Sequence, residues 1–243
     1  MPPILSVITV CFNAQKTIKP TLDSLAPLLL RYPHEVEYLV IDGASTDHTT
    51  DTVRALTPSA RIVSEPDKGI YDAMNKGLAK ATGTYLWFLN AGDAVASEQV
   101  FEAIITRLRT YKPDVLYGDT MIVDSAYRPL HLRRLRPPAK LTENSFLNGM
   151  LVCHQAFIVR RAAAPLYDLR YRFSADYDWC IRILRHSRSN LFLNQVWVYY
   201  LNEGLTTRNH RRSLWERYRI MCRRYGFLSA TARHLYFFFK RAR

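Results

Sequence analysis

Three aspartates in the first half of the chain stand where a small chemical site could form. Asp42, Asp93 and Asp119 each come at or just after the end of an apolar run that is typical of a buried strand. Ligands of open α/β sheets bind beyond the carboxyl ends of the strands, so these carboxylates are expected along one edge. A single aspartate there is usually a turn or cap residue, but three favour a site. Carboxylate oxygens at such an edge are suited to hold a divalent cation and, with it, a phosphate.

The elements that would position these aspartates alternate in type. Five segments rich in β-branched and other apolar residues predict strands, and segments with apolar residues at helical spacing lie between them. This alternation indicates an α/β fold with a mostly parallel sheet and helices on both faces. The expected strands are 6–12, 36–41, 61–64, 85–89 and 115–119, and the expected helices are 16–31, 48–56, 70–81 and 97–111.

The pattern changes after about residue 125. Residues 128–140 are rich in proline and basic residues and contain no acid, which predicts a loop or a poorly ordered excursion. Beyond them we expect strands at 156–159 and 196–200, and helices at 176–186, 210–225 and 229–241. The chain is therefore expected to have three parts: an α/β half at 1–125, a second half of the same domain at 126–207, and a helical tail at 208–243.

Composition limits the class of protein. With 243 residues, 48% of them hydrophobic, the chain can bury a sizeable core. It has no apolar run of about 18–20 residues that would predict a membrane-spanning helix, and its first residues lack the features of a signal peptide. The scattered cysteines favour reduced thiols in a cytosolic protein over disulfides or a zinc site; they are Cys11, Cys153, Cys180 and Cys222.

The positive charge is concentrated in the tail. The chain carries a net charge of +13, and residues 208–243 contain 11 Lys and Arg against one acid, Glu216. Basic residues interleaved with aromatic ones are typical of a segment that lies on an anionic membrane surface. The alternatives are a solvated helix pair that caps the domain, or nucleic-acid binding. No RNP-type, helix-turn-helix or zinc pattern is present, which disfavours nucleic acid as a partner.

Three segments in the first half also resemble a known family. SVITVCFNAQKTIKPTLDSL, VIDGASTDHT and EPDKGIYDAMNKGLAKATGTYLWFLNAGD are similar, in this order, to the inverting glycosyltransferases of family 2. The match spans residues 4–125 and continues more weakly to about 215. The resemblance implies a GT-A-like fold, here with a C-terminal helical extension, and a nucleotide-diphosphate sugar as donor, with UDP favoured. Within the family, the sequence is most similar to bacterial enzymes that assemble exopolysaccharides, including colanic acid. That implies a lipid-linked or oligosaccharide acceptor and a cytoplasmic, peripheral place on the inner face of the cell membrane.

The metal motif of the family, Asp-x-Asp, corresponds here to Asn90-Ala91-Gly92-Asp93. Asp93 is therefore the expected ligand of Mn²⁺ or Mg²⁺, with Asn90, Ala91 and Gly92 beside the donor. Asn90 and Gly92 stand where acids are usual, so we expect weak metal binding until the diphosphate adds its own oxygens. The alternative is a plain turn with Gly92 at positive φ.

Other residues are expected to line the donor pocket. The resemblance places Asp42 beside the nucleotide base, although an Asx-turn would also explain it. Gly69 permits a close approach and precedes a helix N-terminus, which attracts phosphate. Asp72 and Asn75 fall on one face of that helix, either at the donor or as solvated positions. The expected donor residues of this group are Thr9, Phe12, Asn13, Asp42, Asp67, Lys68, Gly69, Asp72 and Asn75.

An inverting transferase needs one general base to take the proton of the acceptor hydroxyl. The Glu-Asp pair that supplies it in the family corresponds to Ala175-Asp176, so Asp176 is the expected base. Asp178 would point elsewhere in a helix. A capping role for Ser174 and Asp176 is compatible with catalysis. Residues expected beside the acceptor or the diphosphate, rather than in structural or solvated roles, are His154, Arg208 and His210.

Two other functions stay open on the sequence. The charge of +13 and the aromatic tail would suit a basic nucleic-acid-binding protein. Asn90 and Ala175, which replace acids of the family pattern, would suit a donor-binding homologue that has lost catalysis. A nucleic-acid-binding protein would not bind sugar nucleotides, and a homologue that has lost catalysis would bind them without turnover.

Overall fold

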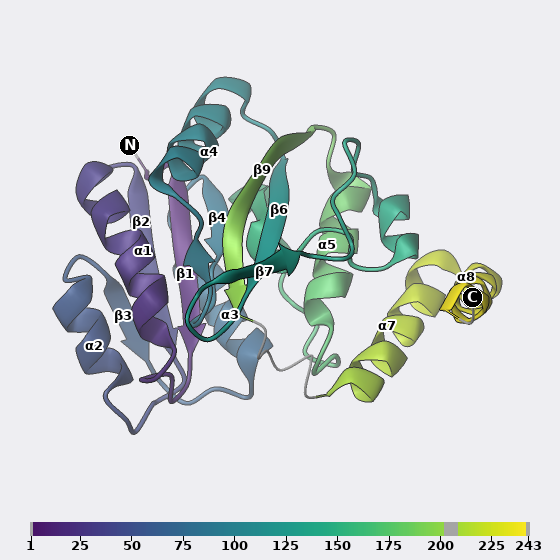
Figure 1. Ribbon diagram of the computed structural model, residues 1–243, viewed down its shortest axis with the longest axis horizontal. Helices are drawn as coiled ribbons and strands as arrows, with labels where there is room; N and C mark the ends of the chain where they lie inside the picture. Colours follow the sequence, from purple (N-terminus) through teal and green to yellow (C-terminus); the bar gives the residue numbers. More distant parts are fainter. Residues whose placement is uncertain (1, 202–208, 242–243) are drawn as a thin grey trace.

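The computed structural model describes residues 2–201 and 209–241 (Figure 1). In these residues one large mixed sheet has the strand order β3-β2-β1-β4-β8-β6-β9-β5, and β7 pairs with β6 outside this path. Helices cover both faces of the sheet, and the last two helices lie at the end of the molecule opposite α1 and α2.

The first half of the sheet is parallel and follows the expected alternation. Its strands are β1 (Leu5–Cys11), β2 (Val36–Asp42), β3 (Arg61–Ser64) and β4 (Tyr85–Phe88), and β1 lies between β2 and β4. The connecting helices are α1 (Ile18–Arg31), α2 (Thr49–Leu56) and α3 (Ile70–Lys80). Because all four strands run the same way, the segments that follow β1, β2, β3 and β4 meet at one edge of the sheet.

The second half of the sheet is mixed. After β5 (Ala94–Val95) and α4 (Glu98–Tyr111), β8 (Phe157–Arg160) runs antiparallel between β4 and β6 (Val115–Val123). β9 (Asn190–Leu201) runs parallel to β6 and antiparallel to β5. It begins six residues earlier than the sequence pattern predicted. The short 3₁₀ helices η1 (Glu143–Asn148), η2 (His154–Ala156) and η3 (Arg161–Ala163) join these strands.

Two predictions for this half were wrong. Asp119 does not end a strand: β6 continues through it to Val123, and its buried carboxylate forms an ion pair with Arg136. Residues 128–140 do not form only a loop, because Pro129–Leu132 is strand β7, antiparallel to β6. All four residues of β7 are exposed, so the strand is short and contributes no buried face, and proline is tolerated at its first position.

Alternate residues of the strands feed two cores, one on each face. In β1, Leu5 and Val7 face the core that includes α1 and α4, whereas Ile8 and Val10 face the core that includes α3 and α5 (Ala175–His186). Helices α7 (His210–Tyr225) and α8 (Phe227–Arg241) add Ile220, with others, to the second core. Among the described residues, none of the helices combines the length and the apolar character needed to cross a membrane.

Candidate active site

A cavity of about 450 Å³ lies beyond the end of β4, between the two halves of the sheet. Its wall comes from the loop after β4, the start of α3, η2, the first turn of α5, the end of β9 and α7. Six residues that the sequence singled out line this one cavity, although they span 87 positions of the chain: Asn90, Ala91, Gly92, Asp93, His154 and Asp176.

Asp93 lies at the bottom of a tightly bonded turn. The Asp93 N–H donates to the Asn90 carbonyl at 3.0 Å, and Gly92 has a φ of +101°, so the glycine turn that the sequence suggested is present. The Thr21 hydroxyl accepts from the Gly92 N–H and donates to the Asp93 carbonyl at 2.6 Å. The turn therefore holds the Asp93 side chain toward the cavity, and a turn role and a ligand role coexist.

The environment of Asp93 favours its neutral form unless a cation is near. Its side chain is only 5% exposed, and burial raises its pKa to about 8 against hydrogen bonds from the Leu201 N–H and the Gln155 side chain. The Asn90 Oδ1 atom, also buried, has no hydrogen-bond partner. Elsewhere in the described chain, too, no three His, Cys, Asp or Glu side chains gather into a metal site. The Asp93 carboxylate and the Asn90 Oδ1 atom are too few to hold a bare divalent cation well, but they fit a cation that is bound together with diphosphate oxygens.

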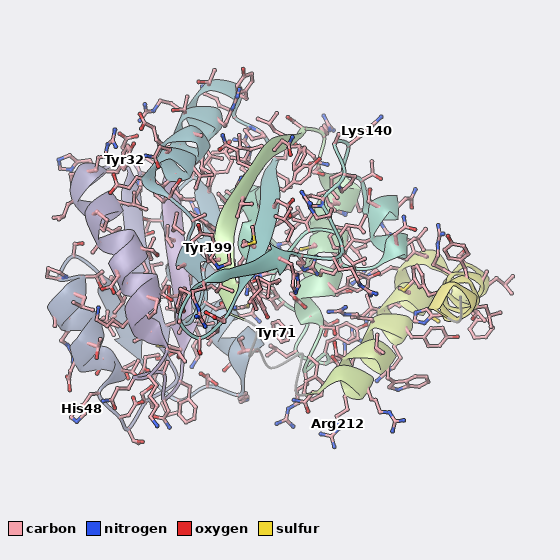
Figure 2. The ribbon with its side chains drawn as sticks, viewed as in Figure 1. Tyr32, His48, Tyr71, Lys140, Tyr199 and Arg212 are labelled. Atoms are coloured by element: carbon pink, nitrogen blue, oxygen red, sulfur yellow. The ribbon has the colours of Figure 1, made fainter. Side chains whose placement is uncertain are left out.

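Asp176 stands in the first turn of α5 and is half-buried. Its Oδ1 accepts a hydrogen bond from the Tyr71 hydroxyl at 3.0 Å and from the Tyr177 N–H at 2.9 Å. Figure 2 labels Tyr71, near the middle of the molecule. Ser174 occupies the N-cap position, but its side chain makes no cap bond. Asp178 does not line the cavity. It is fully buried and pairs with Arg182 at 2.8 Å and Arg224 at 2.7 Å, so the two aspartates of this helix have separate tasks.

An aromatic wall supports the Asp176 side of the cavity. Tyr71 stacks on Tyr167 with ring centroids 5.7 Å apart, and Tyr167 stacks on Trp179 at 4.8 Å. The Tyr167 hydroxyl lies 2.7 Å from the His154 Nε2 atom. Burial lowers the pKa of His154 to about 4, against an opposing effect of Asp176, so the imidazole is neutral near pH 7. His154 can therefore offer a hydrogen bond here, but not a positive charge.

The residues expected near the nucleotide base lie at the ends of β1 to β3. Asp42 is fully buried and accepts from the Ser45 N–H at 2.9 Å and the Ser64 hydroxyl at 2.6 Å, so the Asx-turn is formed. Phe12 is 63% exposed. A Cβ on Gly43 would lie 2.4 Å from the Asp67 carboxylate and 3.3 Å from the Phe12 ring, which places both around one glycine.

Several expected donor residues have structural partners. The Thr9 hydroxyl is buried and donates to the Leu89 carbonyl at 2.7 Å. The Asn75 amide bonds the Tyr167 backbone twice, at 2.7 and 3.1 Å. Asn13, at a φ of +48°, accepts from the Thr46 N–H at 2.9 Å. These contacts fix loops around the site, and a contact of these three side chains with the donor stays a prediction.

Two aspartates fix the loop before α3 by accepting hydrogen bonds from its backbone. Asp72 accepts from the Lys68 N–H at 3.0 Å, and Asp67 accepts from the Gly69 N–H at 2.8 Å. Gly69 has a φ of +120° and space where a Cβ would be, which agrees with the close approach that the sequence suggested. The loop presents the start of α3, with Ile70 and Tyr71, to the cavity.

Among the polar residues of the cavity that were not predicted as site residues are Tyr71, Arg133, Gln155 and Arg217. Arg133 belongs to the basic segment expected to be a loop, and its guanidinium donates to the Met150 carbonyl at 2.6 Å. Arg217 comes from the basic tail. Its spacing from Ser213 and Ile220, one helical turn to either side, is the signal that could have shown it facing the protein. Of the two tail residues that were expected at the site, His210 begins α7, and Arg208 lies outside the described residues.

Comparison with known proteins gives a consistent result. A family model described as glycosyl transferase family 2 matches residues 6–165. A PGL/p-HBAD biosynthesis glycosyltransferase of Mycobacterium bovis is 32% identical over 191 residues, which cover 74% of this chain and 69% of the relative.

Two solved structures have a similar fold. S. aureus TarS 1–349, in complex with UDP-GlcNAc, superposes with a TM-score of 0.69 at 20% identity, covering 89% of this chain and 64% of that one. The mannosyltransferase PcManGT of Pyrobaculum calidifontis, in complex with GDP-Man and Mn²⁺, gives a TM-score of 0.66 at 16% identity, covering 97% and 71%.

Proposed function

The chain belongs to glycosyl transferase family 2 and has the GT-A fold, and from this premise we propose that it moves a sugar from a nucleotide-diphosphate donor to a glycan acceptor with inversion. A UDP-sugar is the favoured donor. The observation that carries the proposal is that Asp93 and Asp176, one from each half of the sheet, line the same cavity. Structures of similar fold in complex with UDP-GlcNAc, and with GDP-Man and Mn²⁺, support a donor of this class.

In this proposal the donor diphosphate lies at the Asp93 end of the cavity. Asp93 and the Oδ1 atom of Asn90 would hold Mn²⁺ or Mg²⁺ together with the diphosphate. The cation, when bound, neutralises the charge that develops on the leaving diphosphate. The nucleoside would extend along the ends of β1 to β3, where the exposed Phe12 ring offers a face for the base and Asp67 lies beside it.

Asp176 acts as the general base at the other end. It takes the proton of the acceptor hydroxyl as that oxygen attacks the anomeric carbon from the side opposite the diphosphate. The Tyr71 hydroxyl, by donating to Oδ1, fixes the rotamer of the carboxylate and leaves Oδ2 for the acceptor. No covalent enzyme intermediate is formed, so the buried thiols Cys153 and Cys180 have no role as nucleophiles.

An anionic membrane surface and a lipid-linked acceptor complete the proposal. Among the side chains of α7 and α8 that the structure describes, five large apolar ones are at least half exposed, namely Trp215, Phe227, Leu228, Leu235 and Tyr236. They lie among arginines in the part of the chain that carries most of the net charge. Such a surface suits the cytoplasmic face of a cell membrane, where lipid-linked precursors of bacterial surface polysaccharides are extended. Co-sedimentation with anionic but not neutral vesicles, weakened by Phe227→Ser with Leu228→Ser, tests this partner.

Nucleotide release tests the proposed reaction. We expect the wild type to release one nucleoside diphosphate from a panel of UDP-, GDP- and dTDP-sugars when a bacterial lipid extract is added as acceptor. Asp176→Asn should bind the same nucleotide but release none above background. Nucleotide binding without turnover in the wild type would instead favour a homologue that has lost catalysis. A protein that binds oligonucleotides in a salt-sensitive way, and no sugar nucleotide, would contradict the proposal.

A further inference from the structure

Helix α7 is fixed to the segment that delivers the catalytic base. The carboxylate of Glu216 accepts three backbone N–H groups in a row, from Arg172 at 2.8 Å, Phe173 at 2.7 Å and Ser174 at 3.0 Å. These residues lead directly into the first turn of α5, which carries Asp176. An anion at this position also interacts favourably with the positive, N-terminal end of the α5 dipole. Glu216 is the only acid among residues 208–243, and its carboxylate makes this attachment.

The inner face of α7 continues the attachment. Ser213 is buried, and its hydroxyl lies 2.9 Å from that of Ser174. Ile220 is fully buried in the core, and Arg224 pairs with Asp178 at 2.7 Å. With position 217 between the first two, these positions recur every three or four residues, which is the spacing of one helix face. A side chain on this face is therefore held in a defined place relative to α5.

Arg217 lies on the same face, directly after Glu216, and lines the cavity with Asp176. Its guanidinium carbon lies 5.9 Å from the centre of the Tyr177 ring. Its Nε atom is buried and has no hydrogen-bond partner, and within residues 2–201 and 209–241 no acid forms a salt bridge with it. A buried N–H group without a partner is unfavourable, so an arginine held this way is ready for an anionic ligand.

The position of Arg217 selects which substrate brings that anion. Burial raises the pKa of the Tyr71 hydroxyl well above its usual value, Asp176 raises it further, and the charge of Arg217 acts in the opposite direction. Arg217 also lines the cavity with Tyr71 and Asp176, and its guanidinium carbon lies 5.9 Å from the ring of Tyr177, the residue after Asp176. In an inverting reaction the base and the leaving group are on opposite faces of the sugar. The group beside the base is therefore part of the acceptor and not the donor diphosphate.

We propose that Arg217 forms an anion subsite for the acceptor, so that the acceptor carries a phosphate or a carboxylate close to the hydroxyl that Asp176 deprotonates. The guanidinium can bind either group through two parallel N–H···O bonds, which also orients the hydroxyl toward the base. This inference rests on the proposed function, since it names the acceptor class of the same site. It narrows that class from any glycan to an anionic sugar or a sugar phosphate.

Binding of three small sugars tests the subsite directly. With the donor end filled by UDP and Mn²⁺, glucose 1-phosphate, glucuronate and glucose are titrated into the wild type and followed by calorimetry or ligand-observed NMR. We expect at least one anionic sugar to bind about tenfold tighter than glucose, and the better of the two identifies phosphate or carboxylate as the recognised group. Arg217→Gln should abolish the preference. Arg219→Gln, an exposed arginine of the same helix, should leave it unchanged.

The same titrations separate the two levels of the proposal. If the wild type does not bind UDP with Mn²⁺, the proposed function itself fails. If UDP binds but neither anionic sugar is preferred over glucose, only the anion subsite is overturned. If Arg217→Gln weakens UDP binding tenfold, the arginine belongs to the donor diphosphate and the subsite is likewise overturned. A preference that survives in Arg217→Gln has the same consequence.

Discussion

The two ends of the cavity hold their carboxylates in different ways. At the proposed donor end Asp93 is enclosed by the backbone of a glycine turn, and burial keeps its pKa near 8. At the proposed acceptor end Asp176 is half-buried, accepts from a tyrosine hydroxyl, and shares the cavity with Arg217, which has no acidic partner among the described residues. A buried carboxylate without a neighbouring positive charge stays neutral unless a cation binds, whereas one that is open to the cavity can exchange a proton with a substrate. In the proposed function the environment, more than the residue type, distinguishes the two roles.

The largest expected effect separates the two ends by activity. Asp176→Asn removes the base but keeps the shape of the side chain, so turnover should fall about 10³-fold. Donor affinity should stay within about twofold, because the donor end is untouched. Nucleotide release and nucleotide binding measured on the same preparation check both statements. A variant that keeps a tenth of the wild-type rate would contradict the role of Asp176.

A neighbouring aspartate sharpens this contrast. Asp178→Asn leaves Arg182 and Arg224 without their buried partner, which should cost about 3 kcal/mol of folding free energy. The folded fraction should turn over at the wild-type rate per molecule, since Asp178 does not line the cavity. Urea denaturation gives the first quantity and an active-site titration the second. A stable but inactive Asp178→Asn protein would show that the two aspartates had been assigned the wrong way round.

The wall between the two ends can be tested by pH. His154 has a folded-state pKa of about 4, below the usual 6.5 that applies on unfolding, so the folded state favours the neutral ring. Its contribution is complete above pH 6.5 and is lost as the pH falls toward 4, by about 3 kcal/mol in all. His154→Asn should therefore show a flatter loss of stability over this range. Parallel stability curves for the two proteins would mean that the imidazole is charged in the fold.

The smallest effect concerns the support of the base. Tyr71→Phe removes one hydrogen bond to Asp176 and should lower turnover about fivefold. Donor affinity should not change, because Tyr71 contacts the acceptor end. Comparing kcat with the dissociation constant of the nucleotide separates these outcomes. Equal losses in kcat and in nucleotide affinity would mean that Tyr71 contacts the donor, and would contradict the separation of a donor end from an acceptor end.

The cavity residues around Asp93 could be predicted from the sequence, and those around Asp176 could be predicted only in part. Asp93 follows a strand and belongs to a family motif, and the parallel strands bring it to the expected edge. Asp176 was found through the family pattern alone. Tyr71, 105 positions earlier, bonds Asp176, and Arg217 from the tail lines the same cavity; no local period encodes such pairings of distant segments. The predicted end of the strand at Asp119 was wrong because the half-exposed Arg136 pairs with the buried Asp119 carboxylate, so β6 continues through an acidic residue.

The most direct test of the central claim is a thermal-shift titration with UDP, GDP, dTDP and CMP, each with and without Mn²⁺, on the wild type and Asp93→Asn. Because ligand binding stabilises the folded state by mass action, one diphosphate should raise the Tm of the wild type with dose and only with Mn²⁺. Asp93→Asn should have an equal or higher Tm without ligand, since it removes a buried carboxylate, and should show no Mn²⁺-dependent shift. A shift that persists unchanged in Asp93→Asn, or no shift with any nucleotide, would contradict a metal-diphosphate site at this end of the cavity.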